Sequence, residues 1–474
     1  MGKKITFIGA GSVVFTRGLV ADLLETFGGE KWRLALVDTD PKALEVSRKL
    51  VGKMLTYKRS DVELTCSTDR RGLLPGSDYV VTMIGVGGRR AWEQDVFIPR
   101  KFGVYQPVGD SVMPGGVSRA MRMIPAMLDI ARDVEKLCPQ AFFFNYANPM
   151  AMICRALRKA GALPVVGLCH GVTDTEGTLA RFAGRDRKSV TSYAVGLNHL
   201  TFMTDLRFDG QDAKPLLREK LSAIKKKGFD YTHIARGFAE WELPEPPLDE
   251  PFSWEIFEKY GAYPAPGDRH ITEFFADRFI GPQSYYGKTL GVDAYSFEQT
   301  IASGDEGYAQ MERLAFSPDA LSEDILRHFS GEHEQLMNII LSIEHDRRQI
   351  FSANLPNNGA VANLPREAVL EMPAAAAALG LKPLLVSGFP DTLAAVISRH
   401  AAIIETAVDA ALRGDKDLFA EAILAGDYIH DRDAVAQMVD ELILAQSAYL
   451  PQFRSQRVAR RGMAGIGGLG RRLD

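Results

Sequence analysis

The chain has 474 residues, 46% of them hydrophobic and 24% charged, which are ordinary values for a globular protein with two or more domains. A formal net charge of −4 leaves no basic excess to neutralise phosphates, which argues against nucleic acid as the main partner. No apolar run approaches the roughly 20 residues of a membrane span, no signal peptide is visible, and the four cysteines lack zinc-like or disulfide-rich spacing, so we expect a cytoplasmic protein with free thiols and no membrane partner.

The first 200 residues alternate short apolar runs with amphipathic helical patterns. Apolar runs without polar alternation are typical of strands buried on both faces, so the pattern predicts a doubly wound parallel sheet of the Rossmann type. The expected strands are 4–10, 32–38, 62–68, 78–85, 141–147 and 164–170, with helices that include 12–27 and 41–55.

The second half of the chain has a different composition. Residues 193–208 are rich in β-branched and aromatic side chains and predict strands, whereas the acidic, Pro-rich segment 241–252 predicts a loop or lid. From about 320 to 455 the pattern is mostly helical, including the small-residue segment EMPAAAAALG. The Gly- and Arg-rich end, 456–474, predicts a flexible tail.

A glycine-rich turn follows the first expected strand, in the segment ITFIGAGSVVF. Gly9 and Gly11 would let the backbone turn sharply and approach a pyrophosphate, which would sit at the helix start beside Ser12. Val14 stands where the G-x-G-x-x-G motif has its third glycine. The turn favours a dinucleotide site, against the alternative that the glycines only end a strand.

Acidic and small residues at later strand ends favour NAD as the dinucleotide. Asp38 ends the second expected strand and would accept hydrogen bonds from ribose hydroxyls while repelling a 2′-phosphate, with Asp40 as the competing candidate. Gly85 belongs to a run of small residues after the fourth strand, which would let the dinucleotide lie over the sheet edge.

Two candidate metal ligands end later segments. GLCHGV places Cys169 beside His170, and GLNHLTF contains His199. A thiolate and an imidazole from neighbouring strand ends could hold a divalent ion and leave positions open for substrate oxygens. The alternatives are a buried Cys169, a His199 satisfied in the core, and thiol catalysis.

Three further motifs carry candidate polar residues. Asn148 precedes a proline in NYANPM and could address the nicotinamide ribose and the substrate, or serve only the turn. Asp110 lies before a Pro-Gly-Gly turn, as a general acid or as a helix cap. YPAPGDRHITEFF packs Asp268, Arg269 and His270 together, and any of them could approach a site across a domain cleft.

In this order, the motifs KITFIGAGSVVFTRGLVADLL, DSVMPGGVSRAMR, NYANPMAM, GLCHGV and GLNHLTF resemble glycoside hydrolase family 4. The resemblance implies a glycosidase that depends on NAD and on Mn²⁺ or another divalent metal. It implies oxidation of the sugar at C3, metal-assisted removal of the C2 proton, elimination of the leaving group and addition of water. The roles that it implies are Cys169 and His199 as metal ligands, Asn148 as the substrate- and cofactor-binding asparagine, Asp110 as acid, and Asp268 as base with Tyr263 as the fallback.

The substrate expectation comes from the residue after Cys169 and His170. Cys-His-Gly is similar to the α-glucuronidase type, whereas Cys-His-Glu resembles α-glucosidases and Cys-His-Ser α-galactosidases. We therefore expect an α-glucuronide or α-galacturonide, with His170 facing the substrate. Arginines available to hold its carboxylate are Arg89, Arg90, Arg119, Arg269 and Arg278. The alternatives are an α-galactosidase or α-glucosidase of the same family, a 2-hydroxy-acid dehydrogenase, and a non-catalytic NAD-binding regulator.

Together these features predict an NAD-binding Rossmann domain over 1–195 and a mixed α+β, largely helical domain over 196–455, in an overall arrangement like that of lactate and malate dehydrogenases. The second domain would carry substrate, metal and oligomer contacts. The expected partners are a sugar or oligosaccharide substrate and further copies of the chain, in a homodimer or homotetramer.

Overall fold

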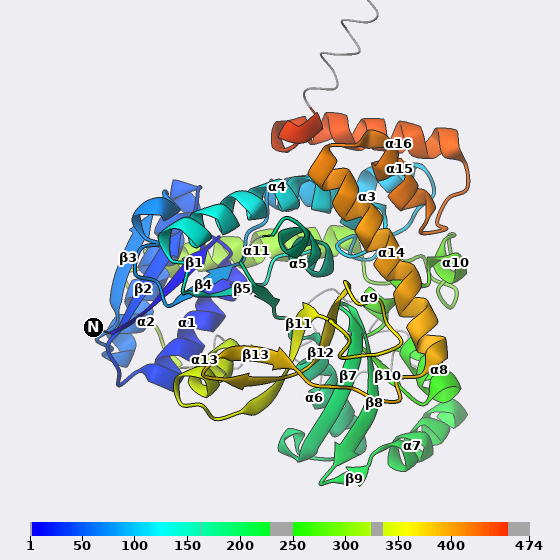
Figure 1. Ribbon diagram of the computed structural model, residues 1–474, viewed down its shortest axis with the longest axis horizontal. Coiled ribbons are helices and arrows are strands. Elements are labelled where there is room, and N and C mark those ends of the chain that lie inside the picture. The colour runs from blue at the N-terminus through cyan, green and yellow to red at the C-terminus, as the bar shows by residue number, and fades with distance from the viewer. Residues whose placement is uncertain (1, 162, 228–249, 324–334, 454–474) are drawn as a thin grey trace, which may run out of the picture.

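The computed structural model describes residues 2–161, 163–227, 250–323 and 335–453. Within these ranges the strands join into one mixed sheet, and its order is β10-β8-β7-β12-β11-β6-β5-β4-β1-β2-β3, with β13 beside β12 and β9 beside β8 (Figure 1). No helix in the described part of the chain is long and apolar enough to cross a membrane.

The N-terminal part of the sheet is parallel and confirms the predicted doubly wound arrangement. The order β3-β2-β1-β4-β5-β6 is the one found in dinucleotide-binding folds. Phe7, Val80 and Phe144 are fully buried, as expected for strands covered on both faces. The strands are β1 Lys3–Ile8, β2 Trp32–Val37, β3 Glu63–Ser67, β4 Tyr79–Thr82, β5 Phe142–Asn145 and β6 Val165–Gly167.

Two groups of helices cover this sheet. Helices α1, α2, α11 and α13 pack with one another, as do α3, α4 and α5, so a helical layer lies on each side (Figure 1). The bounds are α1 Val13–Phe27, α2 Pro41–Lys58, α3 Gly88–Lys101, α4 Pro114–Leu137, α5 Met150–Lys159, α6 Gly171–Ala183, α11 Phe297–Phe316 and α13 Leu336–Glu344. The helices predicted over 12–27 and 41–55 are therefore confirmed.

Antiparallel strands continue the sheet beyond β6. The strands predicted over 193–208 are present as the hairpin β7 Val190–Leu197 and β8 Leu200–Phe208, followed by β9 Gln211–Asp212 and β10 Tyr263–Ala265. In β10, Ala265 pairs with Thr201 of β8. This pairing brings the chain after β10 beside the turn between β7 and β8.

The prediction of a mostly helical segment from 320 to 455 is wrong for its middle part. Strands β11 Gln349–Pro356, β12 Val369–Ala377 and β13 Gly380–Pro383 lie there, and β11 and β12 connect β6 to β7 in the sheet. The alanine run that suggested a helix belongs to β12. Pro373 opposes a helix at this point, and pairing with β11 on one side and β13 on the other fixes the strand.

The remaining helices complete the described chain. They are α7 Lys214–Lys227, α8 Pro251–Tyr260, α9 Asp268–Ile271, the 3-10 turn η5 Thr272–Phe274, α10 Ala276–Phe279, α14 Asp391–Arg413, α15 Lys416–Leu424 and α16 Arg432–Ala445. Helix α14 packs on α4 and α5, and α16 packs on α3, at the upper right of Figure 1.

Three predictions fall wholly or partly outside what the described residues test. The loop or lid expected over 241–252 lies outside the described residues up to 249, and Pro251 and Phe252 begin α8. The tail 456–474 also lies outside the described residues. The division into domains at residue 195 stays a prediction.

Candidate active site

The glycine turn after β1 has a conformation that only glycine adopts readily. Gly9 has φ +92°, and its N–H donates to the carbonyl of Val37 at 2.9 Å. A Cβ atom added at Gly9 would lie 2.8 Å from the backbone nitrogen of Ile84, closer than such atoms approach. The turn therefore packs directly against the chain that leaves β4.

Asp38 follows β2 and lies against this turn, and its role in binding ribose stays a prediction. Its Oδ2 accepts a hydrogen bond from the Gly11 N–H at 2.7 Å. The competing candidate Asp40 instead caps α2, accepting from the N–H groups of Lys42 and Ala43 at 2.8 and 3.3 Å. The structure thus separates the two acids, and Asp38 is the one at the turn.

The surface above the turn fits a dinucleotide. Ser12 is the N-cap residue of α1, yet no side chain caps the helix, so its first N–H groups are available to a phosphate. Gly85 is exposed just beyond β4, and no atom lies within 4 Å of a Cβ added there. Because β1, β4, β5 and β6 are parallel neighbours, the residues that follow them share one edge of the sheet.

Cys169 and His170 connect β6 to α6 at this edge. Cys169 is 8% exposed, and its Sγ accepts from the Gly171 N–H at 3.4 Å. The His170 side chain is 48% exposed, with Nε2 3.7 Å from Oδ2 of Asp174. A Cβ added at Gly171 would lie 2.7 Å from Cβ of Pro266, so α6 begins in direct contact with the chain that follows β10.

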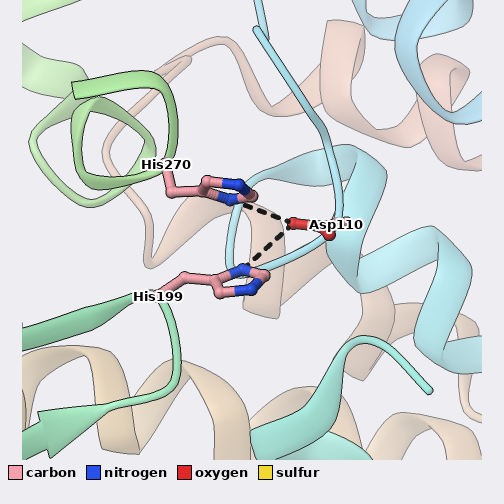
Figure 2. Close-up of side chains that lie close together, drawn as sticks. All are labelled: Asp110, His199 and His270. Atoms are coloured by element: carbon pink, nitrogen blue, oxygen red, sulfur yellow. Dashed lines mark ion pairs between the residues drawn. The ribbon is translucent and has the colours of Figure 1, made fainter. Parts of the chain in front are cut away.

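Asp110, His199 and His270 form a compact cluster, with one possible ligand atom from each within 4.8 Å of the others (Figure 2). Oδ1 of Asp110 lies 3.3 Å from Nδ1 of His199 and 3.8 Å from Nδ1 of His270. The imidazole centroids are 4.1 Å apart. The Ser111 hydroxyl lies 2.9 Å from Nδ1 of His199.

Three separate segments bring these side chains together (Figure 2). Asp110 lies in the loop before α4, and His199 in the two-residue turn between β7 and β8, with φ +68°. His270 lies in α9, which follows β10, and the pairing of β10 with β8 carries it to His199. The Asn198 amide and the Thr201 hydroxyl, on either side of His199, donate to Oε2 of the buried Glu371 at 3.3 and 3.4 Å.

The charges in the cluster suit a divalent cation. Burial alone would raise the pKa of Asp110, but the neighbouring imidazoles of His199 and His270 hold it below its ordinary range. Burial, together with His199, lowers the pKa of His270, which keeps this imidazole neutral. Its buried Nδ1 has no hydrogen-bond partner among the described residues. An ionised carboxylate and a neutral imidazole such as that of His270 are groups that Mn²⁺ and Zn²⁺ accept as ligands.

The predicted base, Asp268, is the first residue of α9 and lies outside the cluster, with its carboxylate against the start of α8. Its Oδ1 accepts from the N–H and hydroxyl of Ser253 at 2.7 and 2.5 Å, and its Oδ2 from the Phe252 N–H and the Tyr285 hydroxyl at 2.8 and 2.6 Å. Burial raises the pKa of Asp268 to about 6, against these hydrogen bonds. The fallback, Tyr263, is buried and donates to Glu250 at 3.1 Å.

A cavity of about 10 Å³, room for about one water molecule, lies between Asp110 and the start of α5. Asp110, Pro149 and Asn198 are among the residues that line it. Asn148 precedes Pro149 through a cis peptide bond, and its Oδ1 accepts from the Met150 N–H at 3.2 Å. The predicted substrate-binding turn is therefore adjacent to the segment that carries Asp110.

Sequence reasoning named Asp110 and His199 but did not place His270 or Ser111 in the site. The signal for His270 was its position directly after Asp268 and Arg269, and the prediction favoured the acid. Ser111 had no signal other than its position next to Asp110. The sulfur of Cys169 is not one of the clustered ligand atoms, so its role as a metal ligand stays a prediction.

Comparison with known proteins identifies the family. Residues 4–184 match the model for the family 4 glycosyl hydrolases, and residues 194–427 match the model for the C-terminal domain of the same family. The chain is 30% identical over 464 residues to an α-galactosidase from Rhizobium meliloti, across 95% of this chain and 89% of that one. It is 28% identical to an α-galacturonidase from Bacillus subtilis, across 93% and 96% of the two chains.

A solved 6-phospho-α-glucosidase from gut microorganisms, in complex with NAD and Mn²⁺, has the same fold. The TM-score is 0.77 at 18% identity, over 96% of this chain and 100% of that one. The two family models together cover most of the described residues, from β1 to α15. The chain therefore belongs to family 4 of the glycosyl hydrolases.

Proposed function

We propose that this glycosidase depends on NAD and a divalent metal and cleaves α-linked hexuronides, either an α-glucuronide or an α-galacturonide. The observation that carries the proposal is the convergence of Asp110, His199 and His270, of which Asp110 also lines a small cavity together with Pro149. A set of side chains that could bind a cation, near the edge of a sheet that also carries a glycine turn, supports this proposal. A simple 2-hydroxy-acid dehydrogenase has no need of such a set, and no observation favours it.

The glycine turn would hold the cofactor. Gly9, Gly11 and Ser12 would receive the pyrophosphate at the start of α1, Asp38 would accept from ribose hydroxyls, and Gly85 would lie beneath the dinucleotide. The solved structure with NAD and Mn²⁺ at a TM-score of 0.77 supports NAD as the cofactor.

The metal would be held by His199 and His270, with Cys169 from the neighbouring turn. Cys169 belongs to this neighbourhood because Gly171 packs on Pro266, four residues before His270. We place Asp110 with the metal-binding residues, because the adjacent imidazoles favour its ionised form. Its role as acid stays a prediction.

When bound, NAD⁺ would accept a hydride from C3 of the sugar, and Mn²⁺ or another divalent cation would stabilise negative charge on the neighbouring sugar oxygens. The chain's own residues would orient the sugar. The Asn148 oxygen is engaged by Met150, which leaves its NH₂ group to donate to a sugar hydroxyl. His170 is exposed beside Cys169 and would contact the sugar from the other side. The base, Asp268 with Tyr263 as fallback, stays a prediction because α8 occupies the Asp268 carboxylate here.

The hexuronide preference needs a cation for the sugar carboxylate, and the structure favours one of the five arginines. Arg89 and Arg90 both pair with Asp305, at 2.5 and 2.6 Å. Arg278 pairs with Glu255 at 2.5 Å, and Arg269 donates to the Thr300 hydroxyl at 2.8 Å.

Arg119 is placed differently from the other four. It lies over the Trp92 ring at 5.6 Å, and it forms no ion pair with a carboxylate in the described part of the chain. Arg119 lies in α4, nine positions after Asp110. Burial lowers the pKa of Arg119, and the charge of Asp110 opposes this effect. We propose Arg119 as the group that holds the uronate carboxylate.

A neutral α-galactoside is the second candidate substrate. The α-galactosidase relative is 30% identical and the α-galacturonidase relative 28%, so overall identity does not separate them. Gly171, whose place after Cys-His suggested a uronide, also has a packing reason in its contact with Pro266. The preference for a hexuronide therefore depends on Arg119.

The test is hydrolysis of p-nitrophenyl α-glucuronide, α-galacturonide, α-galactoside and α-glucoside with NAD⁺, Mn²⁺ and a thiol reductant. We expect a uronide to be cleaved with the highest kcat/KM. Arg119→Ala should lower kcat/KM for the uronide at least tenfold more than for the galactoside. Arg90→Ala, which removes an arginine paired with Asp305, is the control and should change neither. A folded protein that cleaves none of the four would contradict the proposal. The cytoplasmic location and the homodimer or homotetramer stay predictions.

A further inference from the structure

Glu273 is a fully buried acid that no part of the proposed chemistry uses. It lies in η5, directly after the helix that carries His270, and is 0% exposed. Its Oε1 accepts hydrogen bonds from the backbone N–H groups of Val108 and Gly109, at 2.9 and 2.5 Å. These two residues immediately precede Asp110. Glu273 therefore connects the segment of His270 to the loop of Asp110.

The environment of Glu273 is unfavourable for a carboxylate that serves packing alone. Oε2 is buried and has no hydrogen-bond partner among the described residues. Burial, together with the charge of Asp110, raises the pKa of Glu273 to about 8, against the two backbone hydrogen bonds. An apolar residue of the same size would avoid this cost but would leave two buried N–H groups without an acceptor.

The residues on either side of Asp110 have further hydrogen bonds, which come from a different side of the loop. The Trp92 indole donates to the Val108 carbonyl at 2.7 Å, and Gln106 accepts from the Gly115 N–H at 2.8 Å. These hydrogen bonds connect the loop to α3 and α4, and neither helix carries a histidine of the cluster. Glu273 follows His270 by only three positions, so one short segment supplies both a cluster side chain and the support for Asp110.

We propose that Glu273 is a positioning residue that fixes the separation of Asp110 and His270 through the backbone of Val108 and Gly109. The inference rests on the proposed function in one respect, namely that this cluster binds the metal. It predicts that removal of the acceptor weakens metal binding without weakening NAD binding, since the glycine turn lies at a different part of the sheet edge.

The experiment compares Glu273→Leu with Glu273→Gln. Leucine removes the acceptor, whereas glutamine keeps an oxygen that can accept both N–H groups. Glu176→Leu is the control for general destabilisation, because Glu176, in α6, accepts from the hydroxyl of Ser192 in β7 at 2.7 Å and is not one of the residues of the cluster. Three quantities are measured on each full-length protein: hydrogen exchange of the peptide covering 105–113, the Kd for Mn²⁺ and the Kd for NAD⁺.

We expect Glu273→Leu to accelerate exchange in 105–113 and to weaken Mn²⁺ binding at least tenfold, with NAD⁺ affinity within about twofold of wild type. Glu273→Gln should retain most of the Mn²⁺ affinity, and Glu176→Leu should change neither readout. Wild-type exchange and Mn²⁺ affinity in Glu273→Leu would overturn the proposal, as would equal losses of Mn²⁺ and NAD⁺ affinity. A wild-type protein that binds no Mn²⁺ would contradict the proposed metal site, and the exchange measurement would still decide the role of Glu273.

Discussion

Substitution of Gly171 tests whether the contact between α6 and the chain after β10 holds the site together. A Cβ atom at this position lies 2.7 Å from Cβ of Pro266 and 3.5 Å from Sγ of Cys169. Carbon atoms in van der Waals contact are about 3.5–4.0 Å apart, so the first contact requires a shift of about 1 Å. Because the proline ring is rigid, either the turn between Pro266 and His270 or the segment that carries Cys169 has to move.

The energetic cost follows from this overlap. Adding atoms to a well-packed site costs about 1–3 kcal/mol. With an unfolding entropy of roughly 2.1 cal/mol/K per residue, a chain of this length loses about 1–3 °C in Tm. A displacement of one candidate metal-binding residue should also weaken Mn²⁺ binding by about tenfold or more. Gly171→Ala and Gly171→Ser carry the same Cβ, so both should show these effects.

The assay is differential scanning fluorimetry together with calorimetric titration of Mn²⁺ for the two variants. Gly29→Ala is the control, because no atom lies within 4 Å of a Cβ added there. Wild-type Tm and Mn²⁺ affinity in both Gly171 variants would refute the packing argument. A change in the ratio of galactoside to uronide hydrolysis in Gly171→Ser alone would instead show that the hydroxyl at this position selects the substrate.

Three further predictions concern the turn, the thiol and a buried histidine. Gly9→Ala should raise the Kd for NAD⁺ at least tenfold by fluorescence titration, since it combines φ +92° with a 2.8 Å contact to Ile84, and unchanged affinity would count against the turn as the cofactor site. Cys169→Ser should lower activity through Mn²⁺ affinity, so that higher Mn²⁺ restores part of the rate, and full activity with unchanged metal dependence would remove Cys169 from the site. Burial lowers the pKa of His400 to about 4, so the unfolded chain binds a proton first as the pH falls below about 6.5. The free energy of unfolding should therefore fall by up to about 3 kcal/mol between pH 6.5 and pH 4. Chemical unfolding of His400→Leu should show a smaller fall over this range. The same fall in the variant and in the wild-type protein would contradict His400 as its origin.

The parts of the fold with strong local signals could be predicted from the sequence. The strands around Phe7, Val80 and Phe144 are apolar on both faces, so their burial is encoded in the runs themselves. The glycine turn and Asp38 follow from the same short segments. β12 could not be predicted in this way, because its alanines favour a helix locally and only pairing with β11 and β13 decides for a strand.

The candidate site, like the fold, contains residues that local sequence patterns indicate and contacts that only the tertiary structure creates. Asp110 and His199 could be named from their motifs, but their contact with His270 depends on the pairing of Ala265 with Thr201, which no local pattern encodes. Asp268 is predicted as the base because the family resemblance implies that role. Its engagement with α8 is a tertiary contact that becomes visible only in the structure.

The most direct test of the central claim is hydrolysis of p-nitrophenyl α-galacturonide in D₂O with NAD⁺ and Mn²⁺, followed by NMR of the released sugar. Removal of the C2 proton before the leaving group departs predicts deuterium at C2 of the product, and omission of NAD⁺ or addition of a metal chelator should stop the reaction. If the uronide resists cleavage, the same measurement applies to whichever of the four glycosides is hydrolysed. Cleavage that proceeds without deuterium at C2, or without NAD⁺ and metal, would contradict the account.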